Sequence, residues 1–376
     1  MDFTLTDDHL ALRDAVRRCC DGEFPASGRG LPESTETEGR RHAAFAGLGL
    51  LGLQVPPAHG GSGLGPVEAM LAAQELGRAL AGVTWLASAV LAAPLIAEAA
   101  SPAQQDRWLG AMAAGSLRAT LALEEPRMRW ALHDLRTQAR LGADGWQLDG
   151  EKAGVLDGGA AGLLLVLAAA PEGPTLFAVD GGDAGLSRRP YRLLDGRCAA
   201  HLRFAGSRAE PVGRPGAGLE LAESALDRAG AMLVAETTGA AEALMALTLE
   251  HLRTRRQFGK PLAAFQALQH RIADHAIALE LLESMAGVAA LSLQDDTPQR
   301  RVRGVAAART LCAQLGRRLA LDAIQLHGAM GMTEECAAAR YAKRLLVNGA
   351  LFGDADFHRQ RFAALPSDLA SQGDTP

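Results

Sequence analysis

The residues best suited to bind an anionic ligand stand close together around position 255. Arg255 carries a planar guanidinium that can donate paired hydrogen bonds to phosphate oxygens. Gln257 and Gln266 add amide donors and acceptors, and Phe258 adds an aromatic surface. Each of these residues alone is more often a solvated side chain or a polar helix start, so their joint placement matters more than any single identity.

The elements around this group should form a corner between two helices. Gly259, Lys260 and Pro261 should end the first helix, because glycine favours a left-handed C-cap and proline cannot continue a helix interior. A second helix should begin at about Leu262, with apolar residues recurring on one face. The sequence therefore predicts an exposed helix corner that can meet a charged ligand or another subunit.

Composition narrows the class of protein. The formal net charge of −5 over 376 residues argues against a nucleic-acid partner, which usually attracts basic domains. Five scattered cysteines show no metal-ligand spacing and indicate reduced thiols, so we expect a cytoplasmic protein without a metal site. No apolar run is long enough to span a bilayer, and no signal peptide is visible, so we also expect no membrane span.

The pattern of apolar and turn residues along the chain changes twice. Helical periodicity dominates residues 1–118, short segments divided by turn residues fill 119–218, and long helices return over 219–376. We expect an α+β fold that is mostly α, with an N-terminal helical domain, a middle β domain shaped as a barrel or sandwich, and a C-terminal helical bundle.

Three separated segments together resemble the acyl-CoA dehydrogenase family. One is the corner with its Arg-x-Gln-Phe-Gly and Phe-Gln-x-x-Gln patterns, and the second is residues 323–333, similar to the family's Gln-x-x-Gly-Gly-x-Gly loop. The third is residues 47–64, similar to its N-terminal Leu-Gly-Leu…Pro…Gly-Gly segment. Residues 191–196 and 351–356 look most like the small subunit of pimeloyl-CoA dehydrogenase and related bacterial subunits.

The resemblance implies an acyl-CoA substrate, FAD and an oligomer made of identical or related subunits. In the family, FAD reaches across a dimer interface, where a helix-end arginine of the neighbouring subunit meets its pyrophosphate. The cofactor residues implied here are Arg255, Gln257, Phe258, Gln266, Gln325 and Gly328.

Two departures from the family pattern concern the flavin ring. The family's Thr-Glu-Pro…Gly-Ser-Asp segment is here residues 124–131, which begin Glu-Glu-Pro-Arg, and its Trp-Ile-Thr strand is here Gly-Val-Leu at 154–156. The half of the site that would hold a neighbour's adenosine end is kept, while the half that grips the chain's own flavin ring is altered.

A third departure concerns the catalytic base. The reaction removes the α-proton of a thioester while hydride passes to flavin N5, and it needs a carboxylate in a dry site. One family position for this carboxylate is here Phe352, and the other is Ala229. Asp227 and Asp354 are nearby carboxylates that could substitute, although an early-helix acid and a cap are their ordinary interpretations.

Two functions therefore stay open. The chain is either an acyl-CoA dehydrogenase, alone or as a subunit, or a binding subunit without a complete site that supplies its corner to a partner's FAD. An acyl-CoA oxidase on the same fold is a weaker alternative.

Overall fold

The computed structural model describes residues 4–25, 35–81, 84–295 and 297–366. Helices form the first part of the chain, strands the middle and helices the rest, which confirms the predicted α+β fold. The N-terminal helices are α1 (Asp7–Glu23), α2 (Thr35–Gly47), α3 (Pro66–Arg78), the π-helix η4 (Trp85–Ala92), α4 (Ala93–Ala99) and α5 (Pro102–Ala113). The domain boundaries at 118 and 218 remain predictions.

Two of the N-terminal helices, α1 and α5, begin at a hydroxyl cap. The Thr6 hydroxyl accepts a hydrogen bond from the His9 amide at 3.3 Å, and the Ser101 hydroxyl accepts one from the Gln104 amide at 3.4 Å. Both caps satisfy donors that the first helical turn leaves without an intrahelical partner.

The middle strands close into a barrel. They are β1 (Ala119–Ala122), β2 (Gln138–Gly142), β3 (Gly145–Leu156), β4 (Leu163–Ala170), β5 (Gly173–Asp180), β6 (Leu186–Arg192) and β7 (Cys198–Val212). The sheet order is β1-β4-β2-β3-β7-β5, and β4 also pairs with β5 along its whole length, which closes the ring β4-β2-β3-β7-β5. Outside this ring, β1 pairs with β4 and β6 pairs with β7. A compact apolar core that includes Leu148, Val166 and Phe177 fills the interior.

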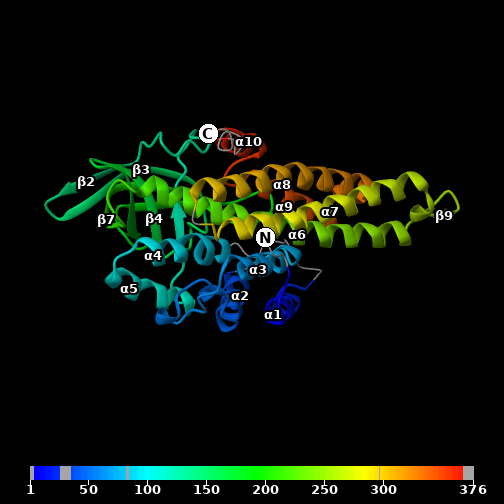
Figure 1. The fold of residues 1–376 in the computed structure, drawn as a ribbon, viewed down its shortest axis with the longest axis horizontal. Helices are drawn as coiled ribbons and strands as arrows, with labels where there is room; N and C mark the ends of the chain where they lie inside the picture. The colour runs from blue at the N-terminus through cyan, green and yellow to red at the C-terminus, as the bar shows by residue number, and fades with distance from the viewer. Residues whose placement is uncertain (1–3, 26–34, 82–83, 296, 367–376) are drawn as a thin grey trace, which may run out of the picture.

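The C-terminal helices extend away from the barrel. They are α6 (Gly218–Thr254), α7 (Gln266–Ser292), α8 (Pro298–His327), α9 (Ala337–Asn348) and α10 (Ala355–Ala363). In Figure 1, α6, α7 and α8 run lengthwise, with the barrel at one end and the turn that carries β9 at the other. The helix α6 is the central element, since it packs against α3, α7, α8 and α9.

The predicted corner exists, but its first helix ends earlier than expected and its second helix begins later. The helix α6 ends at Thr254, because Arg255 adopts an extended backbone. Residues 256–257 (β8) and 260–261 (β9) then form a short antiparallel hairpin, and α7 begins only at Gln266. The Gly-Lys-Pro signal therefore marks a hairpin turn rather than a helix cap.

Two helices, α6 and α7, are long and apolar enough to cross a membrane by length and composition alone. The most apolar window of α6 is 67% buried within the protein, as in a core helix, whereas that of α7 is only 39% buried. The expected absence of a membrane span and the cytoplasmic location remain predictions.

Candidate active site

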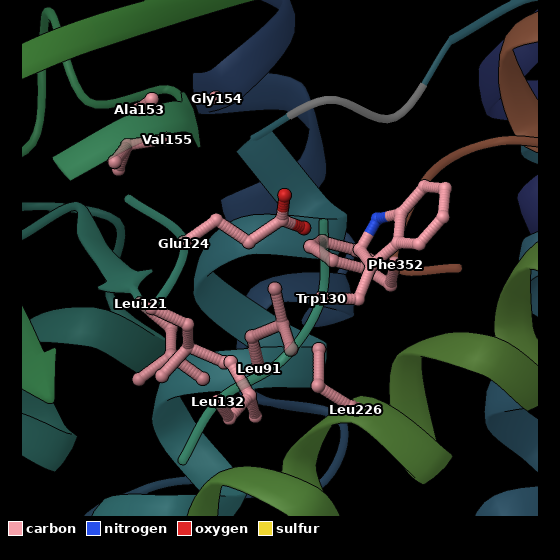
Figure 2. A pocket seen from close by; sticks show the side chains of 11 residues that line it. Leu91, Leu121, Glu124, Trp130, Leu132, Ala153, Gly154, Val155, Leu226 and Phe352 are labelled. Atoms are coloured by element: carbon pink, nitrogen blue, oxygen red, sulfur yellow. The ribbon is translucent and has the colours of Figure 1, made fainter. Parts of the chain in front are cut away.

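One pocket joins the segments that the sequence connected with the flavin ring and the catalytic base. Glu124 follows β1, Gly154 lies on β3, and Phe352 lies between α9 and α10, yet all three line the same pocket. Figure 2 shows their positions together with Leu91 of the π-helix and Leu226 of α6. The cavity volume is about 20 Å³, which is room for about one water molecule.

Glu124 is the functional candidate that sequence reasoning missed. Burial raises the pKa of its carboxyl to about 7. The described residues give this carboxyl no hydrogen bond, and in Figure 2 it lies among the side chains of the pocket. The available signal was a glutamate at the place where the family pattern has threonine.

A buried ion pair next to Glu124 fixes the position of its backbone. The Lys152 ammonium donates to the Leu123 carbonyl at 2.9 Å and to the Glu125 carboxylate at 2.8 Å. Burial lowers the pKa of Lys152 to about 8, against the attraction of Glu125. Glu125 also accepts hydrogen bonds from the backbone amides of Arg136 and Thr137, which lie at the far end of the same loop. The ion pair thus links the start of this loop both to β3 and to the end of the same loop.

A buried arginine holds the turn that carries Phe352. Arg309 of α8 is fully buried and donates to the carbonyls of Asn348 at 2.8 Å, Leu351 at 2.7 Å and Gly353 at 3.1 Å. Phe352 has a left-handed backbone with φ of 56°, which is unfavourable for a residue other than glycine. These hydrogen bonds stabilise that conformation, and Phe352 consequently lies against the pocket.

The two predicted catalytic carboxylates lie elsewhere. Asp227 is fully buried and forms ion pairs with Arg301 at 3.2 Å and Arg361 at 2.9 Å. Asp354 caps α10 by accepting a hydrogen bond from the Phe357 amide at 2.9 Å. Neither residue lines the pocket, and their role in proton removal remains a prediction.

The predicted cofactor residues lie at the far end of the helical bundle. Arg255, Gln257 and Gln266 are exposed there, and Phe258 at the tip of the hairpin is 89% exposed. Phe258 and Gly259 both have left-handed backbones, the geometry of a two-residue hairpin turn. The corner thus presents a guanidinium, amides and an aromatic ring outward, a set of groups that fits a pyrophosphate and its attached nucleoside.

A pair of stacked histidines brings the second cofactor segment to this corner. The rings of His251 in α6 and His327 in α8 lie 4.6 Å apart at an angle of 24°. His251 lies one turn before Arg255, and His327 directly precedes Gly328. Gln325 and Gly328 are both exposed. The structure therefore places the implied cofactor residues of both segments near the same end of the bundle.

Comparison with known proteins decides the family. Residues 6–116 match the model of the acyl-CoA dehydrogenase N-terminal domain, and residues 216–364 match that of the C-terminal domain. Acyl-CoA dehydrogenase FadE27 of Mycobacterium tuberculosis is 30% identical over 356 residues, which cover 91% of this chain and 92% of that protein. The chain belongs to the acyl-CoA dehydrogenase family. Its members are flavoprotein oxidoreductases that use FAD and dehydrogenate acyl-CoA.

Two solved structures show similar folds over nearly the whole chain. The Tcur3481-Tcur3483 steroid ACAD G363A variant is 30% identical, with a TM-score of 0.86 and coverage of 98% of this chain and 99% of that one. A chain of the ChsE4-ChsE5 complex from Mycobacterium tuberculosis is 26% identical, with a TM-score of 0.85 and full coverage of both chains. The narrower resemblance to the pimeloyl-CoA dehydrogenase small subunit remains a prediction.

Proposed function

We propose that this acyl-CoA dehydrogenase chain is a subunit that completes the FAD site of a related partner chain. The observation that carries the proposal is the distance between the two half-sites. Leu226 lines the pocket and Arg255 marks the corner, and at about 1.5 Å per residue they lie about 43 Å apart along α6. One dinucleotide is too short to contact both places in one chain, so a flavin contacted by the corner belongs to another subunit.

The chemistry of the complex would be α,β-dehydrogenation of an acyl-CoA thioester. FAD, when bound, accepts the hydride that leaves Cβ. The contribution of this chain is binding: Arg255 donates to pyrophosphate oxygens, and the amides of Gln257, Gln266 and Gln325 surround the nucleotide. Gly328 leaves room for close approach of the backbone.

Exposed apolar side chains on the bundle support an oligomer. Leu247 of α6, Ile277 and Leu281 of α7 and Leu321 of α8 are all exposed. Large apolar side chains left exposed on the helices of a bundle are consistent with a surface that a partner subunit covers. The solved relatives named as two-component complexes, Tcur3481-Tcur3483 and ChsE4-ChsE5, favour a related partner rather than only a second copy.

A complete dehydrogenase is the second candidate, and Glu124 favours it. A carboxyl in an apolar pocket with its pKa raised to about 7 could accept a proton near neutral pH. The same pocket would then have to admit both the substrate and a flavin ring.

Purification with and without a partner separates these functions. We expect the chain alone to be colourless and to gain flavin only when it is co-expressed with a related subunit, and that flavin to bleach with an acyl-CoA under anaerobic conditions. Arg255→Ala should lower the flavin retained by the complex about tenfold or more, since hydrogen bonds to charged groups contribute about 1.5–3 kcal/mol. The matched control is Arg140→Ala on the exposed strand β2, which should leave flavin content unchanged.

Stoichiometric flavin on the chain purified alone would instead support the complete dehydrogenase. Unchanged flavin content in the Arg255→Ala complex would remove the proposed role of the corner.

A further inference from the structure

We propose that Trp130 closes the ring pocket of this chain, so that the chain holds no flavin ring of its own. The inference rests on the proposed function and deepens it, because it names the residue that makes the chain depend on a partner. The carrying observation is a loop whose tryptophan lies in the pocket where the family pattern places flavin contacts.

The cavity is too small for a flavin. Its volume is about 20 Å³, whereas a cavity that admits a single benzene molecule measures about 150 Å³. The isoalloxazine of FAD is a tricyclic system and needs more space than benzene. The pocket therefore does not fit the ring, and a side chain would have to leave before the ring could enter.

Trp130 is the largest side chain that lines the pocket. It stands in the segment that replaces the family's Thr-Glu-Pro…Gly-Ser-Asp pattern, where small residues would leave space. Figure 2 shows its indole among the residues that line the pocket, which also include Phe352 and Glu124. Its ring also packs against Phe357 of α10, with centroids 5.7 Å apart. The indole is thus held between the loop and the C-terminal helices.

The loop around Trp130 has an unusual backbone conformation. Arg127, Arg129 and Trp130 all have left-handed backbones, with φ of 70°, 47° and 64°. Each such residue costs about 1–2 kcal/mol, so the arrangement persists only where neighbouring contacts stabilise it. Met128 and Leu132, which flank Trp130, are buried and supply such contacts.

Two further residues act in the same direction as the indole. Phe352 puts an aromatic ring where other family members place a carboxylate, and Glu124 adds a carboxyl that the described residues leave without a hydrogen bond. Covering this carboxyl with a flavin ring would remove it further from water, which is unfavourable for its charged form. The pocket is therefore too small for a flavin ring, and the Glu124 carboxyl also makes its lining unfavourable for one.

Lumiflavin is the probe that tests this inference without the corner, because it consists of the isoalloxazine without the ribityl phosphate arm. Binding is measured by quenching of its fluorescence with the purified full-length chain, and thermal unfolding checks that each variant is folded. We expect no saturable binding by the wild-type chain and saturable binding by Trp130→Gly. The dissociation constant of the variant should be at least about tenfold below the lower limit set for the wild-type chain. Trp146→Gly is the matched control, since Trp146 lies on β3 against Phe177 and does not line the pocket.

Trp130→Leu is a second variant that keeps an apolar side chain in the loop and is less disruptive to folding; it should also bind lumiflavin more tightly than the wild-type chain. Tight binding by the wild-type chain, or folded Trp130 variants that bind no better than it, would overturn the inference. A measurement without variants is the flavin content of the wild-type complex. We expect one FAD for every two chains, and one FAD in every chain would also overturn the inference.

Failure of this inference and failure of the proposed function give different results. If Trp130 does not close the pocket, the wild-type chain binds lumiflavin tightly or the Trp130 variants bind it no better. The Arg255→Ala complex still loses FAD in that case. If the corner has no role, the Arg255→Ala complex keeps FAD regardless of what lumiflavin does.

Discussion

Gly239 of α6 lies so close to Gln74 of α3 that a β-carbon on Gly239 would stand 1.9 Å from the Gln74 carbonyl oxygen. Gly77 of α3 has the reciprocal relationship with Glu236, at 2.0 Å from the Glu236 carbonyl oxygen. The two helices therefore meet backbone to backbone through a pair of glycines. This contact ties the N-terminal helices to the bundle through α6, the helix that also carries Leu226 of the pocket.

We expect Gly239→Ala to destabilise the chain by at least about 1–3 kcal/mol, because the backbone of α3 would have to move. The measurement is the free energy of unfolding in urea. Gly22→Ala is the control, since no atom lies within 4 Å of its β-carbon position and alanine favours the helix by about 0.5–1 kcal/mol. Equal stability of the Gly239→Ala variant and the wild-type chain would contradict the tight contact.

Glu124 should make stability depend on pH. Its pKa rises from 4.5 to about 7 on folding, so between these values the native state binds more protons than the unfolded state. The wild-type chain should therefore lose stability as the pH rises through this range, by up to about 3 kcal/mol. Glu124→Gln cannot titrate, so its stability relative to the wild-type chain should increase from pH 4.5 to pH 7.

Thermal unfolding of both proteins across that range is the measurement for Glu124. Glu172→Gln, in the exposed turn between β4 and β5, is the surface control. A constant difference between Glu124→Gln and the wild-type chain at all pH values would show that the carboxyl is hydrated rather than buried.

Asp227→Asn should destabilise the chain by about 3 kcal/mol, because the substitution leaves Arg301 and Arg361 without their buried carboxylate partner. Asp356→Asn breaks a pair with Arg359 in which both side chains are exposed, and it should change stability by less than about 1 kcal/mol. The measurement is again urea unfolding. A stable Asp227→Asn chain whose complex no longer reduces flavin would instead support Asp227 as the base.

Ile277→Asp should weaken the oligomer without unfolding the subunit. Ile277 on α7 is 61% exposed in the single chain, so a carboxylate there is tolerated until a partner covers it. Sedimentation velocity should show smaller species for this variant, with unchanged circular dichroism. Leu141→Asp is the control, since Leu141 is 67% exposed on β2 of the barrel, away from the bundle. Equal dissociation of both variants would argue against an interface on α7.

Local signals in the sequence were sufficient for the order of the elements. The change from helices to short strands and back to helices depends on neighbouring residues, and the structure confirms this order. The hydroxyl caps at Thr6 and Ser101 likewise depend only on residues within one helical turn. The end of α6 was predicted too late because the pairing of Arg256 with Pro261 is a hairpin contact that helix propensities do not contain.

The interior of the site could not be derived in the same way. Asp227 meets arginines that are 74 and 134 residues away in the chain, so its ion pairs follow from the packing of α6, α8 and α10. Trp130 lies in the pocket on a loop in which Arg127, Arg129 and Trp130 itself adopt left-handed backbones, a conformation that none of these residue types favours. The resemblance to a family indicated that this region was altered, and three-dimensional packing was needed to show what the alteration does.

The length of α6 has a consequence for how the chain tolerates change. Since this single helix joins the pocket to the corner, its length sets both the distance between them and their relative orientation about the helix axis. One inserted residue would move the corner by about 1.5 Å and turn it by about 100° around the helix axis. The partner's flavin would then meet the wrong face of the corner, even though every residue named for it was still present. Insertions in the loops at the barrel end should be accepted far more readily than a single one within α6.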